Sequence, residues 1–311
     1  DLLYAVPVPE QAGVSNTTVT MNAASMNNSG FEFSATYRNR DRDFKYELSA
    51  NLSTLRNRVT SLGFGTDSYI SGAYITNVGQ EIGQFYGWAY EGIARTQEDL
   101  DNHATQEGAQ IGDCLYKDIS GPDGKPDGKV DANDQVVLGS GMPKIHFGLN
   151  ARFEYKRFDL SIATFGALNY HVSDDIYNSL NSCYGWGNKE VGMLDANRFS
   201  EDGSTYLSNV PRTYVTNSAS LGWNDLFSSR KIQNAAYWKI ANVELGYNFP
   251  NEWFGKYVSD VRFYVSAQNL HTFTGYHGYN VDYAGGTFTP GYNFCSYPTA
   301  RTFMCGVHFT F

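Results

Sequence analysis

The feature that most constrains the fold is a repeated alternation of apolar and polar residues in long runs. The chain ends on one of these runs, where Phe303, Cys305, Val307, Phe309 and Phe311 alternate with small or polar residues. Because successive side chains of a β-strand point to opposite faces, such a run has one apolar and one polar face. The C-terminal residues 301–311 therefore predict a strand that continues to the end of the chain.

The same alternation recurs along the rest of the chain. Several runs contain ten or more residues, which matches the roughly 9 to 11 residues of a tilted transmembrane strand better than the five or six typical of globular sheets. The pattern therefore favours an all-β fold with membrane-crossing antiparallel strands. We predict eight strands, at residues 31–38, 44–53, 84–94, 145–156, from Phe158 onward, and at 241–249, 261–267 and 301–311.

The lengths of the connections support the same interpretation. The joins at Arg157 and across 250–260 are short, whereas the segments 95–143, 172–235 and 274–300 are long and polar. Outer-membrane barrels combine short periplasmic turns with long extracellular loops, so we expect the three long segments outside the cell. Residues 58–78 do not fit this alternation, because the predicted strands place this long segment on the periplasmic side, where the turns should be short.

Composition excludes several classes of protein. The formal net charge of −9 provides no basic surface for nucleic acid, and no stretch approaches the roughly 20 consecutive apolar residues of a membrane helix. The chain begins at Asp1 without the layout of a signal peptide, so we expect it to be a fragment.

The four cysteines show no C-x-x-C spacing, which argues against a zinc ribbon or a thioredoxin-like site. Cys305 lies on an apolar stripe and is expected to act as a small apolar residue. Cys114, Cys183 and Cys295 fall in predicted loops. Two of these three could form a disulfide in an oxidising compartment, and the sequence does not indicate which pair.

The acidic segment 118–134 resembles a calcium loop. When Asp123 is counted as position one of such a loop, Gly128 falls at position six, where the backbone turns sharply. Two positions depart from the pattern: Lys125 occupies the ligand position three, and the final ligand at position twelve is Asp134 instead of a Glu. Asp118 could replace the missing ligand. The pattern predicts a Ca²⁺ site, with a solvated acidic turn as the alternative. The candidate ligands are Asp123, Asp127, Lys129 through its backbone carbonyl, Asp131 and Asp134.

The predicted loops are rich in aromatic residues that could bind a solute. Aromatic rings beside polar groups suit stacking on sugars or contact with peptide side chains. Tyr and Trp also form girdles at the membrane interfaces of barrels, so this alternative stays open. The candidate binding residues are Trp186, Trp223, Tyr279 and Tyr283.

Motifs of catalysis are absent from the sequence. There is no G-x-S-x-G, no H-E-x-x-H and no G-x-x-x-x-G-K-[ST], and the six histidines are scattered singly. Acidic pairs such as Asp174 and Asp175 are expected to be solvated loop residues. We therefore expect that the chain is not an enzyme.

Several short segments carry a family resemblance when they are taken in order. They are Asn28-Ser-Gly-Phe-Glu32, Gly79 to Trp88, Glu91-Gly-Ile93, Asp118 to Asp134, Pro143 to Asn150, Tyr155 to Leu160, Asn242 to Tyr247, Arg262 to Leu270 and Tyr297 to Thr302. Over nearly the whole chain, this series resembles the C-terminal part of SusC/RagA-like TonB-dependent outer-membrane transporters.

The resemblance implies a plugged transmembrane barrel of roughly 22 strands, of which residues 1–311 would be the C-terminal part, without the plug. Polar side chains such as His146, Arg152 and Glu154 would face the lumen. The implied partners are the remainder of the barrel and its plug, a SusD-like surface lipoprotein, the TonB complex through a missing N-terminal region, and outer-membrane lipids. The implied substrate is an oligosaccharide or a peptide, and the implied location is the bacterial outer membrane.

A second function class remains compatible with the alternation itself. A secreted calcium-dependent β-sandwich that binds glycans or mediates adhesion would show strands with the same periodicity. The two classes differ in their apolar stripes, which a sandwich buries and a barrel turns outward. Solubility without detergent distinguishes them.

Overall fold

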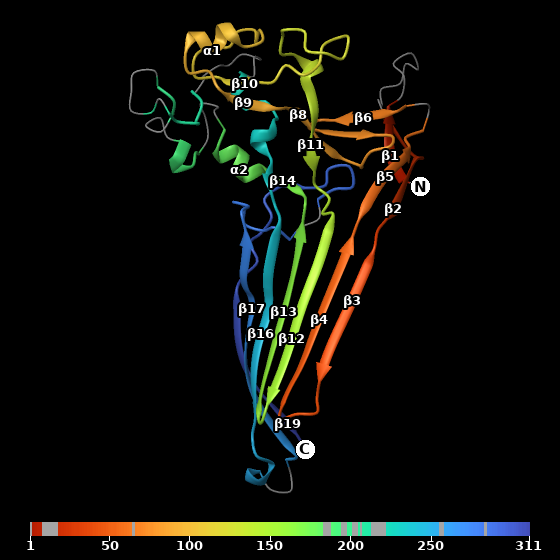
Figure 1. Cartoon of the computed structure of the whole chain (residues 1–311), viewed down its shortest axis with the longest axis vertical. Coiled ribbons are helices and arrows are strands. Elements are labelled where there is room, and N and C mark those ends of the chain that lie inside the picture. The colour runs from red at the N-terminus through yellow and green to blue at the C-terminus, as the bar shows by residue number, and fades with distance from the viewer. Residues whose placement is uncertain are drawn as a thin grey trace.

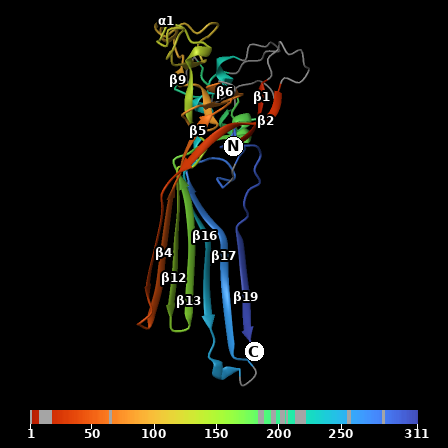
Figure 2. The same ribbon diagram turned by 90° about the vertical axis from the view of Figure 1, so that its right-hand side faces the viewer.

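A computed structural model describes residues 2–7, 18–63, 66–182, 188–193, 198–200, 205, 207–212, 222–254, 258–282 and 285–311. The molecule has two parts, a tall sheet and an assembly of loops with small sheets at one end of it (Figure 1). Viewed from the side, the tall sheet is curved and its strands run nearly parallel to the long axis (Figure 2). The C-terminus lies at the end of the sheet opposite the loop assembly.

The tall sheet, here called the main sheet, has seven strands, and every neighbouring pair is antiparallel. In spatial order the strands are β19 (Thr302–Thr310), β17 (Asp260–Thr274), β16 (Tyr237–Asn248), β13 (Phe158–Leu168), β12 (Ile145–Tyr155), β4 (Phe44–Thr54) and β3 (Glu32–Asn39). Their spatial order follows their order in the chain, as in a meander.

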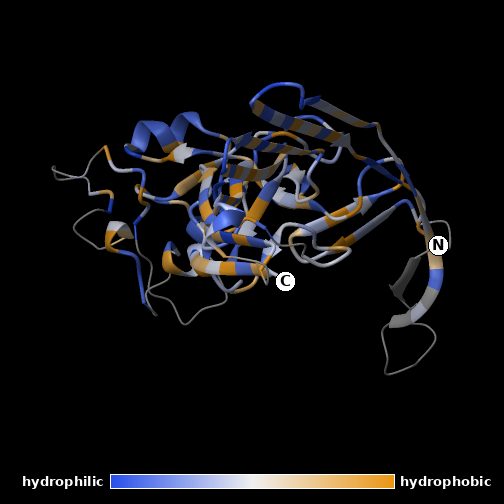
Figure 3. Ribbon diagram, turned by 90° about the horizontal axis from the view of Figure 1, so that it is seen from below, coloured by the Kyte–Doolittle hydropathy of each residue, from blue (hydrophilic) through white to orange (hydrophobic). Residues whose placement is uncertain are grey.

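The pairing registers place the apolar stripes of all seven strands on the same face. Leu52 pairs with Phe33 and Phe147, and Phe158 pairs with Tyr155 and Tyr247. In Figure 3 the strands carry bands of hydrophobic and hydrophilic residues. Phe33 is 63% exposed and Phe158 is 53% exposed. Among the described residues, no second sheet therefore packs against the apolar face, as it would in a β-sandwich.

Aromatic side chains gather near both ends of the apolar face. At the end with short turns, the rings of Phe44 and Phe153 stack with their centroids 6.0 Å apart. The ring centroids of Phe158 and Tyr247 are 4.8 Å apart at the same end. Near the loop assembly, the rings of Trp238 and Phe273 stack at 5.3 Å. Aromatic girdles at two levels are typical of sheets that cross a membrane, where the rings lie at the two interfaces.

The connections of the main sheet alternate strictly between short and long. Residues 40–43, Lys156 and Arg157, and residues 249–259 make the turns at one end. The described residues of the segments 55–144, 169–236 and 275–301 lie in the loop assembly at the other end. The predicted asymmetry between turns and loops is present in the structure.

The predicted third strand, at residues 84–94, is not part of the main sheet. It is divided into β8 (Gln84–Trp88) and β9 (Tyr90–Ile93), which belong to small sheets in the loop assembly. Phe85 is fully buried there, and Trp88 and Tyr90 pack against a buried cluster in the assembly. Because residues 84–94 stay at the loop end, residues 58–78 lie at that end too, and their apparent misfit disappears.

Four small sheets are described in the loop assembly. One has β1 (Leu2–Pro7), β2 (Thr18–Ser29) and β5 (Arg56–Ser61); another has β6 (Ser68–Ser71), β7 (Tyr74–Asn77), β8 and β11 (Gln135–Ser140). The others pair β9 with β10 (Cys114–Tyr116), and β14 (His171–Asp174) with β15 (Gln233–Asn234) and β18 (Tyr292–Asn293). Within the described residues, 3₁₀ turns lie at Ala132–Asp134, Val191–Met193, Trp223–Asp225, Ser229–Lys231 and, among the short turns, Asn251–Trp253.

Two short α-helices lie in the loop assembly. Thr96 caps α1 (Gln97–Asn102) in a capping box with Asp99, and Asp174 caps α2 (Asp175–Leu180). Within the described ranges, no helix combines the length and the apolar character needed to cross a membrane.

A bulge alters the predicted alternation in β16. The pairing with both neighbours is irregular around Ala241, which strict alternation with Val243 and Leu245 would place on the apolar face. The extra residue reverses the alternation beyond it, as a β-bulge does. As a result Lys239 pairs with Phe165 and Tyr237 with Ala167, on the polar side of the sheet.

The main sheet and the loop assembly share a ribbon that bends at Gly30. β2 continues into β3, and β4 continues into β5, so that one antiparallel pair extends from the sheet into the assembly. Phe31 and Thr54 exchange hydrogen bonds at the bend: the Phe31 N–H donates to Thr54 Oγ1 at 3.0 Å, and the Thr54 N–H donates to the Phe31 carbonyl at 2.8 Å. A Cβ atom at Gly30 would lie 1.8 Å from the Thr54 carbonyl oxygen.

We predict that Gly30→Ala destabilises the fold, because the added methyl group forces the two strands apart. An overpacked position typically costs about 1 to 3 kcal/mol. The measurement is thermal unfolding of the purified protein in detergent. Gly92→Ala is the matched control, because a Cβ at Gly92 meets no atom within 4 Å. Equal stability of the two variants would contradict the assigned role of Gly30.

Candidate functional site

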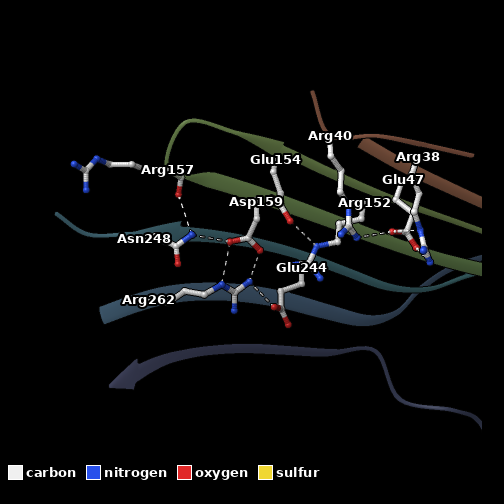
Figure 4. Close-up of polar contacts among 10 residues, drawn as sticks. All are labelled: Arg38, Arg40, Glu47, Arg152, Glu154, Arg157, Asp159, Glu244, Asn248 and Arg262. Atoms are coloured by element: carbon white, nitrogen blue, oxygen red, sulfur yellow. Dashed lines mark hydrogen bonds and ion pairs between the residues drawn. The ribbon is translucent and has the colours of Figure 1, made fainter. Parts of the chain in front are cut away.

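A charged cluster on the polar face of the main sheet joins three strands near the short turns (Figure 4). Arg262 of β17 donates to both carboxylate oxygens of Asp159 on β13, from Nε at 3.0 Å and from Nη2 at 2.5 Å. The same Nη2 donates to Glu244 of β16 at 2.7 Å, and Asn248 donates to Asp159 at 3.4 Å. A guanidinium fork suits this bidentate geometry, so Arg262 ties the three strands together through their side chains.

A second cluster lies on the neighbouring strands of the same face. Glu47 Oε2 of β4 accepts from Arg38 Nε at 2.8 Å and from Arg40 Nη2 at 3.4 Å. On β12, Arg152 Nε lies 3.1 Å from Glu154 Oε1. A shallow hollow of about 360 Å³ is lined by Arg40, Lys45, Tyr46, Glu47, Arg152 and Glu154. Arg152 and Glu154 lie on the polar face, as the alternation predicts.

The polar face therefore offers many hydrogen-bond donors and acceptors of both charges, without a catalytic geometry in the described part. Neither cluster places a nucleophile beside a general base. Such a surface suits polar contact with a passing solute or with another part of a protein. The exposed ion pairs contribute little to stability on their own.

A second network joins two of the long loops within the assembly. Arg212 donates to both oxygens of Asp113, at 2.6 and 2.8 Å, and the Asn224 amide donates to Asp113 at 2.8 Å. Asn224 in turn accepts from the Cys114 N–H at 2.7 Å. Asp113 is 3% exposed, so its charge is compensated almost entirely by these partners. The loops 55–144 and 169–236 are thus fastened to each other.

The candidate aromatic residues have different environments. Trp223 packs beside Tyr116, with ring centroids 6.3 Å apart, and donates from its indole to the Glu107 carbonyl at 2.8 Å, so it belongs to the core of the loop assembly. Tyr279 is 65% exposed. Trp186 and Tyr283 lie outside the described residues. Binding of a solute by these four residues stays a prediction.

The carboxylates of the acidic segment hold its own backbone. Asp134 accepts from the N–H groups of Ile119, Ser120 and Asp131 at 2.7, 2.9 and 2.8 Å. Asp118 accepts from Gly128 at 2.8 Å. The other acidic side chains with backbone partners are Asp127, which accepts from Lys129, and Asp131, which accepts from Asn133.

This arrangement does not resemble a preformed calcium cage. In the part of the chain that the structure describes, no three His, Cys, Asp or Glu side chains converge on a point that could hold a metal ion. Calcium binding by residues 118–134 stays a prediction, and calorimetric titration with CaCl₂ tests it. Binding heat that Asp123→Asn and Asp127→Asn both remove is expected, and no binding heat in the unmodified protein would contradict it.

No disulfide joins any two of the cysteines in the described part of the chain. Cys114 is buried in β10, and Cys295 and Cys305 are exposed. Cys305 lies in β19 on the apolar face, as predicted, and Cys183 lies outside the described residues. No disulfide between Cys114 and Cys295 is formed.

One buried site was not recognised in the sequence. Asp174, which we had expected to be solvated, is 3% exposed. It accepts hydrogen bonds from the Tyr276 hydroxyl, from the Asn293 amide at 2.9 Å and from the Tyr177 N–H at 2.9 Å. Its position before a short helix is a capping signal that the sequence does carry. Its partners 102 and 119 residues away carry no local signal.

The chain is similar over its whole length to TonB-dependent receptors. It is 30% identical over 330 residues to TonB-dependent receptor P3 of Formosa agariphila and 26% identical over 318 residues to TonB-dependent receptor SusC of Bacteroides thetaiotaomicron. The alignments include 100% of this chain but 31% and 29% of those receptors. The chain thus spans about a third of the length of these relatives. No protein-family model matches the sequence.

Solved structures show the same partial match. The whole chain superposes on 32% of a chain in the structure of the RagAB peptide transporter, with a TM-score of 0.78 and 21% identity. It superposes equally on 32% of a chain in the RagAB peptide importer in the closed-closed state, with a TM-score of 0.76 and 23% identity. The fold is therefore that of part of these proteins. TonB-dependent receptors are non-enzymatic outer-membrane proteins, which confirms the expected location and the absence of an enzymatic role.

The buried Asp134 generates a prediction on acid stability. Burial alone would raise the pKa of this carboxyl, but the backbone donors of Ser120, Asp131 and Ile119 outweigh burial, so its pKa lies below its ordinary value. A carboxyl whose pKa is lowered by folding contributes stability that is present above its unfolded pKa and is lost as the pH falls through its folded pKa. Amide protection of Ile119 and Ser120, measured by hydrogen exchange, should therefore decrease in that acidic range.

Asp134→Asn should weaken the same protection at neutral pH. The amide keeps the size of the side chain but offers one acceptor oxygen, so buried N–H groups lose a partner at a cost of about 1 to 3 kcal/mol. Asp123→Asn, compared in buffer without Ca²⁺, is the matched control, because Asp123 is exposed in the same segment. Unchanged protection in Asp134→Asn would show that this carboxylate does not organise the loop.

Proposed function

We propose, from the homology of this chain to part of the SusC/RagA-family TonB-dependent receptors, that it forms the C-terminal wall of an outer-membrane barrel that imports a nutrient. The observation that carries the proposal is the division of one seven-stranded sheet into an exposed apolar face and a charged face. β12 and β13 have 11 residues each, close to the roughly 9 to 11 of a tilted membrane strand. The apolar face would contact lipid, and the charged face would line the interior.

The barrel itself is part of the proposal. β3 and β19 are the edges of the main sheet, and unpaired edge groups in a bilayer lose hydrogen bonds that no water can replace. Pairing of these two strands with further strands of the same protein would complete a barrel of roughly 22 strands. A plug inside it would contact the charged face, and an N-terminal region would connect it to the TonB complex.

The loop assembly would be the extracellular side. It lies opposite the short turns and carries exposed aromatic side chains such as Tyr279 and Tyr297. A SusD-like surface lipoprotein is the partner that we propose for it, and an oligosaccharide or a peptide is the substrate. The RagAB structures are of a peptide transporter. This similarity favours a peptide over an oligosaccharide as the substrate.

Transport is tested with the full-length protein in cells. Deletion of its gene should abolish growth on one class of nutrient, oligosaccharide or peptide, supplied as the carbon source, and the intact gene should restore growth only when TonB is functional. Co-purification with a surface lipoprotein should accompany the activity. Restored uptake in cells without TonB would contradict the proposal.

The orientation of the sheet is tested by two neighbouring substitutions. Leu149→Arg puts a charge on the apolar face at the middle of β12, where a lipid-facing cation costs about 2 to 4 kcal/mol. Asn150→Arg is the matched control, because Asn150 is the next residue of the same strand and points to the polar face. We expect Leu149→Arg to lower the amount of folded protein in the outer-membrane fraction, with Asn150→Arg close to the unmodified level. The reverse order would contradict the proposed faces.

A further inference from the structure

The connection between β17 and β19 folds back over the polar face of the main sheet. In Figure 1 it stays near the level where the sheet meets the loops, far below α1. The polar-face residues at that level are buried, with Tyr237 7%, Lys239 5% and Ala167 2% exposed. The same face is open near the short turns, where the Arg152 side chain is 63% exposed. The connection thus covers one end of the polar face and leaves the other end uncovered.

Two contacts fasten the first half of this connection, one to the loop that follows β13 and one to β16 of the sheet. The Tyr170 hydroxyl donates to the Val281 carbonyl at 3.0 Å, and Lys239 Nζ lies 3.8 Å from Asp282 Oδ2. Lys239 also lies over the ring of Phe165, 5.7 Å from its centroid. The apolar side chains around them form one buried cluster of Ala167, Tyr170, Val172, Ala235, Tyr237, Tyr276 and Val281.

Asp174 fastens both halves of the connection at once. It accepts from Tyr276 in the first half and from Asn293 in the second, and Asn293 also donates to the Tyr276 hydroxyl at 2.9 Å. Backbone contacts join the same segments. β14 pairs in parallel with β18 of the second half, and the Ser173 N–H donates to the Gly291 carbonyl at 2.8 Å. A buried carboxylate with this many partners is costly to leave unpaired, which holds the three segments together.

The second half of the connection also packs closely against the remaining long loop. A Cβ atom at Gly141 would lie 2.0 Å from the Pro290 carbonyl oxygen, and one at Gly83 would lie 2.5 Å from Pro290 Cδ. Backbone approaches of this kind leave no room for sliding. The connection therefore contacts the main sheet, the loop 55–144 and the loop 169–236 at once.

We propose that residues 275–282 and 285–293, here called the strap, are a fixed part of the import path that Asp174 holds against the sheet. The strap narrows the extracellular end of the polar face and keeps the described loops in one rigid body with the sheet. This inference rests on the proposed import function. Its consequence is that the opening and closing of the path are carried by segments other than the strap and the described residues that it contacts.

A disulfide across the strap tests its immobility during transport. Ser173 and Tyr292 are directly paired across β14 and β18, and Cα atoms of paired strands lie within the range that a disulfide spans. The variant is full-length protein with Ser173→Cys and Tyr292→Cys in a Cys295→Ser background, with each single substitution as control. Nutrient uptake by cells should be the same before and after oxidation. Uptake that is lost on oxidation and restored by a reductant would overturn the proposal.

Hydrogen exchange gives a second test that needs no disulfide. In the purified full-length transporter, the amides of residues 276–282 and 289–293 and that of Ser173 should exchange equally slowly with and without the imported nutrient. Asp174→Ala should accelerate this exchange at least tenfold. Asp113→Ala is the matched control, because Asp113 is as buried as Asp174 but belongs to the other network. Nutrient-dependent exchange, or equal effects of the two variants, would overturn the proposal.

Uptake measurements distinguish a failure of the proposed import function from a failure of the fixed strap. If cells with the unmodified protein take up no nutrient of either class, the proposed import function is wrong. If the unmodified protein imports and the oxidised variant does not, only the fixed strap is wrong.

Discussion

The register of the antiparallel ladders is the constraint on which the rest of this structure depends. A shift of one residue between two neighbouring strands would move every apolar side chain of one strand to the opposite face. The seven strands keep their stripes aligned across all six pairings. An apolar face and a charged face follow directly, and with them the two environments that such a sheet can separate.

The loop assembly is held by a different kind of interaction. Its small sheets have two to four strands, too few to build a large core. Buried carboxylates supply the missing order: Asp113, Asp134 and Asp174 are each at most 3% exposed and each accept three or more hydrogen bonds. Each joins segments distant in the chain or fixes the backbone of one loop. The sheet thus depends on strand register, whereas the loops depend on compensated charge.

The acidic segment shows why a motif needs geometry before it becomes a site. The Asp residues of this segment have the spacing of calcium ligands, which predicts a calcium loop. The same residues can equally accept hydrogen bonds from backbone N–H groups. In the structure Asp134 and Asp118 do the latter. Spacing determines which residues are close together, but the direction in which each carboxylate points depends on the turns between them.

Seven of the eight predicted strands, their two faces and the alternation of short turns with long loops could be predicted from the residues alone, because a period of two along a strand is a local property that needs no distant contact. The place of residues 84–94 could not, since short buried strands and membrane strands share the same aromatic alternation and differ only in what covers them. Only the tertiary structure decided this place, the bulge at Ala241, the burial of Asp174 and the path of the strap. These features depend on partners up to 119 residues away, and side-chain periodicity carries no information about contacts of that range.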